Sequence, residues 1–175
     1  MSGDIINKVA KSGLITIDLS DFSKGIVIDE FDLKDFLFDG VVLKEKDFRK
    51  SLKEYDFNKH KNKAVAVSCS SQSIIPMWAY MLISSCLHDV CNKIYFGTKK
   101  TVLQKLMLEK INLLDASKYN NKKVIIKGCG TVPLSQDLYL AITKKLQPNV
   151  NSLMFGEACS AVPVYKKRKN ESKNY

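Results

Sequence analysis

Hydrophobic residues in this chain fall into short runs of strand type that alternate with longer stretches of helical spacing. The strand-type runs are Ala64–Ser68, Lys93–Phe96, Val124–Lys127 and Ser152–Phe155. The helical stretches are Met77–Leu87, Lys99–Leu114 and Leu138–Leu146. Alternation of this kind is typical of right-handed βαβ crossovers and a parallel sheet covered on both faces. We therefore predict an α/β fold, a three-layer domain with a mainly parallel sheet.

The pattern before these runs is less regular. Ser2–Ser12 has helical spacing, Leu14–Leu19 alternates as a strand does, and Ile26–Ile28 and Val41–Leu43 are shorter strand candidates. The acidic stretch between the two short candidates favours neither a helix nor a strand. Glu45–Tyr55 is predicted as a helix, because Phe48 and Leu52 lie four residues apart on one face.

The two halves of the alternating region repeat the same pattern with an offset of 59 residues. Each half starts with a polar, lysine-rich segment before a strand, at 59–63 and 118–122. In each half a proline and a helix follow, and the half ends at a Phe-Gly pair, at 96–97 and 155–156. We therefore predict two similar αβαβ units.

The length of 175 residues, of which 45% are hydrophobic, fits one domain with a sizeable core. We expect this domain to cover 1–165, with an N-terminal helix and strands at 1–43 and the repeated core at 44–165. The basic segment 166–175 is expected to be a disordered tail. No signal peptide is expected, and the longest apolar stretch, Ile74–Leu87, is too short to span a bilayer. A cytoplasmic protein without a membrane partner is expected.

The net charge of +10 is unevenly distributed. The segment Asp18–Asp39 is acidic, whereas the densest basic run is Lys166–Lys169. No recognisable DNA- or RNA-binding motif accompanies the lysines, so nucleic acid is not the expected partner. The acidic segment and the basic remainder could instead pair in a homo-oligomer or dock a protein partner. A non-catalytic protein-binding module is therefore one of the functions left open.

Three of the five cysteines follow predicted strands. Cys69 follows the strand at 64–68, Cys129 the strand at 124–127, and Cys159 the strand at 152–155. Ligands of open α/β sheets bind beyond the carboxyl ends of the strands, and the common strand order 2-1-3-4 would make these three strands neighbours about 4.8 Å apart. We therefore expect the three thiols to cluster, with Glu157 as a fourth donor. Such a donor set suits zinc or an iron–sulfur cluster.

The same cysteines are also compatible with packing and with thiol catalysis. Cysteine packs well as a small apolar residue, and no C-x-x-C pair occurs among the three. Alternatively, Cys129 is the nucleophile or redox centre of a thiol-dependent enzyme, because Gly128 and Gly130 would let a substrate approach its backbone. Cys86 and Cys91 lie on diverging helix faces and are expected to be packing or surface residues.

Several phrases of the sequence resemble an uncharacterised bacterial family of unknown function, DUF2480. These phrases are Asn7–Ala10, Gly13–Leu19, Leu43–Arg49, Cys69 with Pro76–Tyr80, Lys127–Cys129, Leu146–Pro148 and Phe155–Pro163. The resemblance implies no established activity, and it implies a cytoplasmic housekeeping protein associated with iron–sulfur assembly. The resembling phrases contain Cys69, Cys129, Glu157 and Cys159. The leading expectation is therefore a metal- or sulfur-handling accessory protein that uses these residues.

Overall fold

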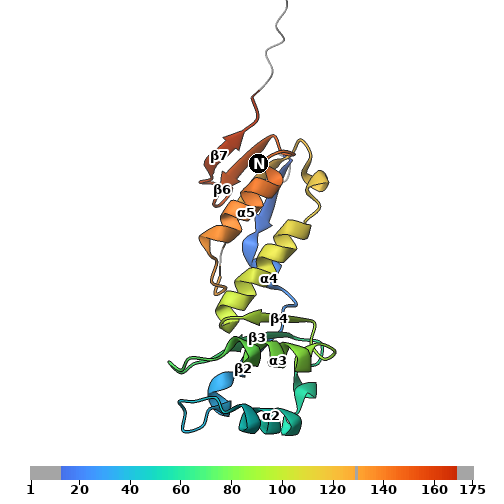
Figure 1. The fold of residues 1–175 in the computed structure, drawn as a ribbon. Coiled ribbons are helices and arrows are strands. Elements are labelled where there is room, and N and C mark those ends of the chain that lie inside the picture. Colours follow the sequence, from blue (N-terminus) through green and yellow to red (C-terminus); the bar gives the residue numbers. More distant parts are fainter. Residues whose placement is uncertain (1–12, 129, 169–175) are drawn as a thin grey trace, which may run out of the picture. The chain divides into compact units, whose positions relative to one another are not determined.

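The computed structural model describes residues 13–128 and 130–168 (Figure 1). The strands are β1 (Leu14–Asp18), β2 (Ile28–Asp32), β3 (Ala64–Ser68), β4 (Lys93–Phe96), β5 (Lys123–Lys127), β6 (Ser152–Phe155) and β7 (Val162–Lys166). The α-helices are α2 (Glu45–Glu54), α3 (Met77–Leu87), α4 (Lys99–Leu113) and α5 (Gln136–Leu146). The short 3-10 helices are η1 (Leu19–Ser23), η2 (Leu33–Phe36), η3 (Phe57–His60) and η4 (Ala116–Tyr119). The predicted α/β class with parallel strand pairing is confirmed.

The chain divides into two compact units, with one boundary between Lys24 and Gly25 and the other within α4. Unit 2 is the continuous segment Gly25–Lys105, and unit 1 comprises the two flanking segments. Unit 1 contains a four-stranded sheet of order β1-β5-β6-β7, and unit 2 contains a three-stranded sheet of order β2-β3-β4. Every pairing is parallel except that of β7 with β6. The single sheet of order 2-1-3-4 is therefore wrong, because the strands that precede Cys69 and Cys129 belong to different sheets.

The two units repeat the same local structure at the predicted offset of 59 residues. In each unit, the side-chain amide of one asparagine donates to the backbone oxygen of another, from Asn92 to Asn62 in unit 2 and from Asn151 to Asn121 in unit 1. Asn62 and Asn121 both have positive φ angles, of 61° and 57°. Asparagine tolerates this left-handed conformation better than most residues do, which explains its recurrence at the turn before β3 and β5.

The same agreement holds at the other end of each strand–helix–strand segment. The amide of Gly97 donates to the oxygen of Val67 at 3.0 Å, and the amide of Gly156 donates to that of Ile126 at 3.0 Å. Both glycines have positive φ angles, which residues with a side chain rarely adopt. The Phe-Gly pairs of the sequence therefore end β4 and β6 in the same way, and the prediction of two similar units agrees with their hydrogen bonds.

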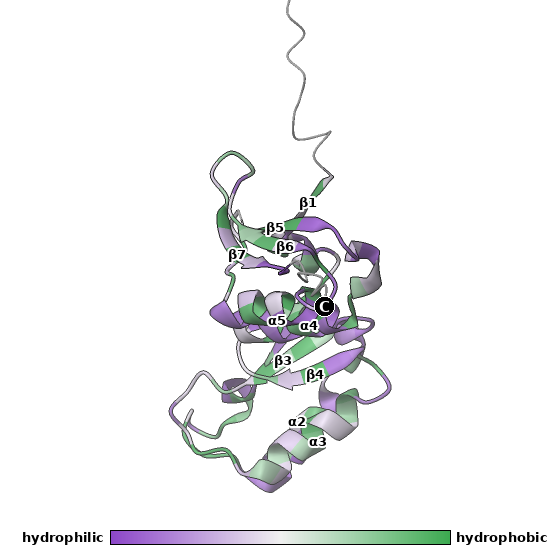
Figure 2. Cartoon of the chain, turned by 90° about the horizontal axis from the view of Figure 1, so that it is seen from above, coloured by the Kyte–Doolittle hydropathy of each residue, from purple (hydrophilic) through white to green (hydrophobic). Residues whose placement is uncertain are grey.

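The core of each unit is built on its central strand. Four residues of β3 and three of β5 are buried, as expected for strands that have a neighbour on either side. Figure 2 shows the hydrophobic colour along β3 and α3. In unit 2 the buried side chains include Phe31, Phe48 and Ile83, which come from β2, α2 and α3. Hydrophobic burial on this scale is the main force that holds such a fold together.

Some predictions for the ends of the chain differ from the structure. Of the short strand predicted at Ile26–Ile28, Ile28 alone lies in β2, and Val41–Leu43 forms only an isolated bridge between Val42 and Phe38. Lys166 is the last residue of β7, and the helix predicted over Ser2–Ser12 lies outside the described residues. No helix in the described part of the chain is both long enough and apolar enough to cross a bilayer.

Candidate functional site

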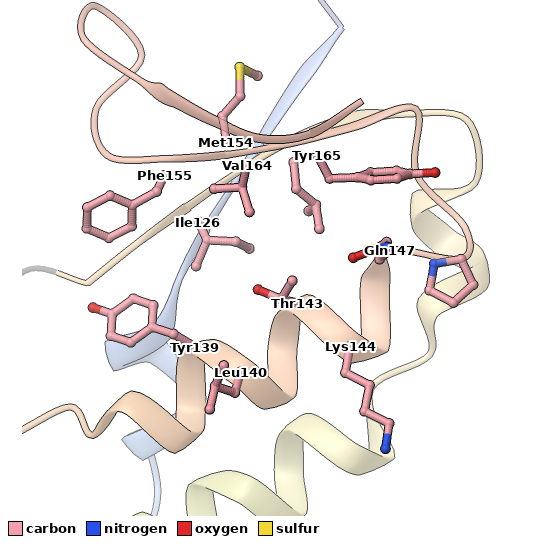
Figure 3. Close-up of a pocket in the computed structure, with 12 residues that line it drawn as sticks. Ile126, Tyr139, Leu140, Thr143, Lys144, Gln147, Met154, Phe155, Val164 and Tyr165 are labelled. Atoms are coloured by element: carbon pink, nitrogen blue, oxygen red, sulfur yellow. The ribbon is translucent and has the colours of Figure 1, made fainter. Parts of the chain in front are cut away.

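A groove of about 920 Å³ lies in unit 1 between α5 and the strands β6 and β7 (Figure 3). The sheet contributes Ile126, Leu153 and Phe155, and β7 adds Val164. Leu140 lines the opposite side from α5, although 68% of it is exposed. The exposed fractions of Phe155 and Val164 are 46% and 56%. A folded domain normally buries such side chains, so their concentration in one groove marks a place that a ligand could cover.

The groove has chemically different ends. Figure 3 shows the rings of Tyr139 and Phe155 at one end, and Gln147 and Tyr165 at the other. Thr143 lies between the two ends on α5 and is half-buried. The first end is therefore formed by two rings, and the hydroxyl of Tyr139 lies against Gly128. The other end offers an amide and a phenol hydroxyl as hydrogen-bonding groups.

A glycine positions the aromatic end of the groove. A side chain on Gly128 would collide with the hydroxyl of Tyr139 and with Leu134. The absence of a Cβ therefore lets Tyr139 lie close over the backbone that follows β5. From there its ring meets that of Phe155, with centroids 5.8 Å apart and planes inclined by 75°. This edge-to-face geometry is a favoured one for aromatic rings.

The charged residue that lines the groove is basic. Among the described residues that line it, Lys144 is the single charged one, and none carries a carboxylate. Tyr165 is followed directly by Lys166, Lys167 and Arg168, which are all exposed. The polar end of the groove therefore lies in a positive surrounding, which favours a ligand with an acidic group there.

The structure does not bring the predicted metal ligands together among its described residues. Cys69 is half-buried in unit 2, where its Sγ lies 3.1 Å from Oγ of Ser71. Cys159 is exposed in unit 1, and Glu157 is paired there with Lys127 at 3.4 Å. Cys129 lies outside the described residues. No group of three or more metal-ligating side chains occurs in the ranges 13–128 and 130–168, so the predicted metal site stays a prediction.

Cys69 and Cys129 also follow their strands at different positions. Ser68 and Lys127 end β3 and β5, so Cys69 corresponds to Gly128 in the repeat, and Cys129 corresponds to Ser70. Cys69 and Cys129 therefore do not occupy equivalent positions. The two remaining cysteines are poor candidates for thiolates, because burial raises the pKa of both Cys86 and Cys91.

A buried polar network that the sequence did not reveal lies at the start of β2 and β3 in unit 2. His60 is 1% exposed, with Nδ1 3.1 Å from Oδ2 of Asp29 and Nε2 2.9 Å from the hydroxyl of Tyr55. Because a carboxylate only accepts, Nδ1 carries the proton and Nε2 accepts from Tyr55. Lys63 donates to the same Asp29 oxygen at 2.8 Å.

This network has the character of a structural element. Burial lowers the pKa of His60 and outweighs the opposite effect of Asp29. The hydrogen bond from Lys63 is the largest cause that lowers the pKa of Asp29. The rings of Tyr55 and Phe31 surround His60, with centroids 5.8 Å and 6.4 Å away, so the imidazole is enclosed by the core of unit 2.

The groove could have been suspected from the sequence through one signal. Tyr139 and Phe155 lie 59 residues after Tyr80 and Phe96, so the repeat preserves an aromatic pair as well as the turns. The width of the groove depends on β7, however, and that strand is interrupted by Pro163 and was not predicted.

Comparison with known protein families gives a match over most of the chain. The family described as "Protein of unknown function (DUF2480)" matches residues 3–167. No curated protein and no solved structure matches the chain.

Proposed function

The chain belongs to the DUF2480 family, and we propose that it binds a small amphiphilic molecule, with an apolar body and an acidic head, in the groove of unit 1. The observation that carries this proposal is the groove itself, which is apolar along its length and polar at one end. Its volume of about 920 Å³ lies within the range of small-molecule sites, about 300–1,000 Å³.

The proposed orientation follows from the two ends. The apolar body would lie against Ile126 and Leu153, with its tip between Tyr139 and Phe155. The acidic head would lie near Gln147 and Tyr165, which can donate hydrogen bonds. Lys144 and the basic residues after β7 would add a favourable potential at that end.

A binding role suits the groove better than catalysis. Among the described residues, those that line it include neither a cysteine nor a histidine nor a carboxylate, which are common nucleophiles and general bases. The polar groups that line it serve recognition, because they fix the orientation of a ligand whose apolar surface supplies most of the affinity.

The proposal is tested with anilinonaphthalenesulfonate (ANS), a fluorescent probe with an aromatic body and an acidic group. We expect one saturable ANS site per chain, which a long-chain carboxylate such as laurate displaces. The variant Phe155→Ser should weaken ANS binding by about tenfold, because it removes a wall of the groove. Unchanged ANS affinity in this variant, with its fold intact by circular dichroism, would exclude the groove.

The metal- or sulfur-handling role is a separate proposal that rests on the sequence alone. Its ligands would be Cys69, Cys129, Cys159 and Glu157, with zinc or an iron–sulfur cluster as the bound group. The thiol-enzyme alternative likewise depends on Cys129. Metal content and thiol reactivity are measured separately from ligand binding, so both roles can be tested independently of it.

A further inference from the structure

Unit 2 contains a second, smaller pocket that is built like the aromatic end of the groove. Its volume is about 350 Å³, and it is lined by Val67, Met77, Tyr80, Ile94 and Phe96. The residues come from β3, α3 and β4 of unit 2. The pocket is therefore formed by one helix packed against two neighbouring parallel strands, as the groove is by α5, β5 and β6.

Four of these five residues have counterparts in the groove. Val67, Tyr80, Ile94 and Phe96 precede Ile126, Tyr139, Leu153 and Phe155 by 59 residues each. Strand pairing preserves the relation, because Val67 pairs with Phe96 just as Ile126 pairs with Phe155. The aromatic contact is preserved as well. The ring centroids of Tyr80 and Phe96 lie 5.6 Å apart, with the planes inclined by 87°.

The two sites differ in the properties that select a ligand. None of the five residues that line the pocket is charged, whereas Lys144 lines the groove. Ser85 and His88 of unit 2 stand where Lys144 and Gln147 stand in unit 1. The order β2-β3-β4 also contains no counterpart of β7 among the described residues, so the pocket lacks the wall that lengthens the groove.

The position after the central strand also differs between the two units. Unit 2 has Cys69 where unit 1 has Gly128, and Cys69 is close enough to Tyr80 to raise the pKa of that phenol, after the larger effect of burial. Unit 2 thus has a side chain at the position where, in unit 1, Tyr139 and Leu134 pack against a glycine. Two walls of the pocket remain accessible, since Met77 is 75% exposed and Phe96 is 65% exposed.

We infer that unit 2 carries a second ligand site, for a compact uncharged apolar group such as an aromatic ring. The inference rests on the proposed function in one respect, namely that a pocket between one helix and two neighbouring parallel strands binds a ligand. The shared residues explain why both sites take an aromatic body. The missing lysine and the missing strand explain why the pocket takes neither a long ligand nor an acidic one.

The test uses two probes with the same aromatic body. ANS carries a sulfonate, and phenylnaphthylamine (NPN) is its uncharged counterpart. Equilibrium dialysis of the full chain with saturating ANS should still show one NPN site per chain. Phe96→Ser should weaken that NPN binding by about tenfold, while Phe155→Ser changes it by less than about twofold.

A second variant protects the test against loss of the fold. Met77→Glu places a carboxylate on the wall of the pocket at the first residue of α3, where a negative charge stabilises the helix. It should weaken NPN binding by about tenfold without lowering stability, because burial of the probe would desolvate the charge. Amide resonances of β3, α3 and β4 should shift on NPN binding.

The outcomes separate the two proposals. NPN binding that saturating ANS abolishes, or that both Phe96→Ser and Met77→Glu leave unchanged, overturns the second site and leaves the groove standing. ANS binding that Phe155→Ser leaves unchanged overturns the groove, whereas NPN binding that responds to the unit 2 variants keeps the second site.

Discussion

The phenol ring of Tyr139 meets the ring of Phe155 nearly edge-on, with 5.8 Å between the ring centroids. The contact joins the first turn of α5 to the last residue of β6, so it fixes how closely the helix approaches the end of the strand. The equivalent pair in unit 2, Tyr80 and Phe96, has nearly the same spacing of 5.6 Å. A repeated geometry of this kind is an architectural element on which a binding site can be built.

Gly128→Ala should disturb the groove directly. The new methyl group would collide with Tyr139 and Leu134, which must move away from their packed positions. We expect a loss of about 1–2 kcal/mol in the free energy of unfolding, together with weaker ANS binding. The measurements are urea denaturation and fluorescence titration. Cys69→Ala at the equivalent position of unit 2 is the control, and equal ANS effects in both variants would contradict the role of Gly128.

Removal of the positive charge at the polar end should change ligand preference. In the double variant Lys144→Gln and Lys166→Gln, we expect ANS affinity to fall by about three- to tenfold, since exposed charges each contribute about 0.2–1 kcal/mol. Binding of uncharged NPN should change little. Added salt should weaken ANS binding to the wild-type chain more than to the variant, because salt screens exposed charges. Equal losses for both probes would argue against an acidic head.

His60 should make the stability of the fold depend on pH. Its pKa is lowered in the folded state by burial, so the unfolded chain takes up a proton first as the pH falls. The free energy of unfolding should therefore decrease below about pH 6.5, the ordinary value for histidine. Asp29, whose pKa is also lowered, adds a loss of the same sign at more acidic pH, below its ordinary value of 3.8.

His60→Gln tests this assignment by chemical denaturation at several pH values. The variant should lose about 1–3 kcal/mol near neutral pH, because Asp29 and Tyr55 lose a buried partner. It should also lose most of the decrease between neutral pH and about pH 5. His88, the only other histidine, has a side chain that is 81% exposed, so His88→Gln should retain that decrease. The same pH profile in both variants would refute the assignment.

The predicted metal site can be tested by measuring the metal content of the chain. Elemental analysis and a visible spectrum of the chain, purified without oxygen and without a histidine tag, should show near-stoichiometric zinc, or iron with sulfide absorption. Replacement of Cys69, Cys129 or Cys159 by serine should each lower metal occupancy, whereas Cys86→Ser should not. A colourless wild-type chain without metal would end the metal hypothesis and direct attention to the reactivity of Cys129.

The sequence predicted best the elements whose burial decides their structure. The bounds of β3, β4, β6 and α3 agree with the prediction residue for residue. The central strand β3 has four buried residues in a row, which produces an apolar run without competing interpretations. In β2, by contrast, Phe31 is the one fully buried residue and three acidic residues surround it, so the acidic segment gave no strand pattern.

The partition of strands into two sheets could not be predicted in the same way. Strand order depends on long-range pairing, and β1 and β2 could each have joined either central strand on the basis of local pattern. The predicted cysteine site depended on that order, because residues that follow two strands lie close together only when the two strands are neighbours in a sheet. The groove escaped prediction because β7 contains Pro163 and exposes most of its side chains.

The division of the chain has a consequence for the order of folding. Unit 2 is continuous, whereas β1 of unit 1 pairs with β5, and the whole of unit 2 is synthesised between those two strands. During translation unit 2 can therefore complete its sheet before β5, the strand that pairs with β1, has been synthesised. The ligand groove would be the last part to form, since its outer wall, β7, ends only at Lys166. A nascent chain would thus hold a finished aromatic pocket before it has an amphiphile-binding groove.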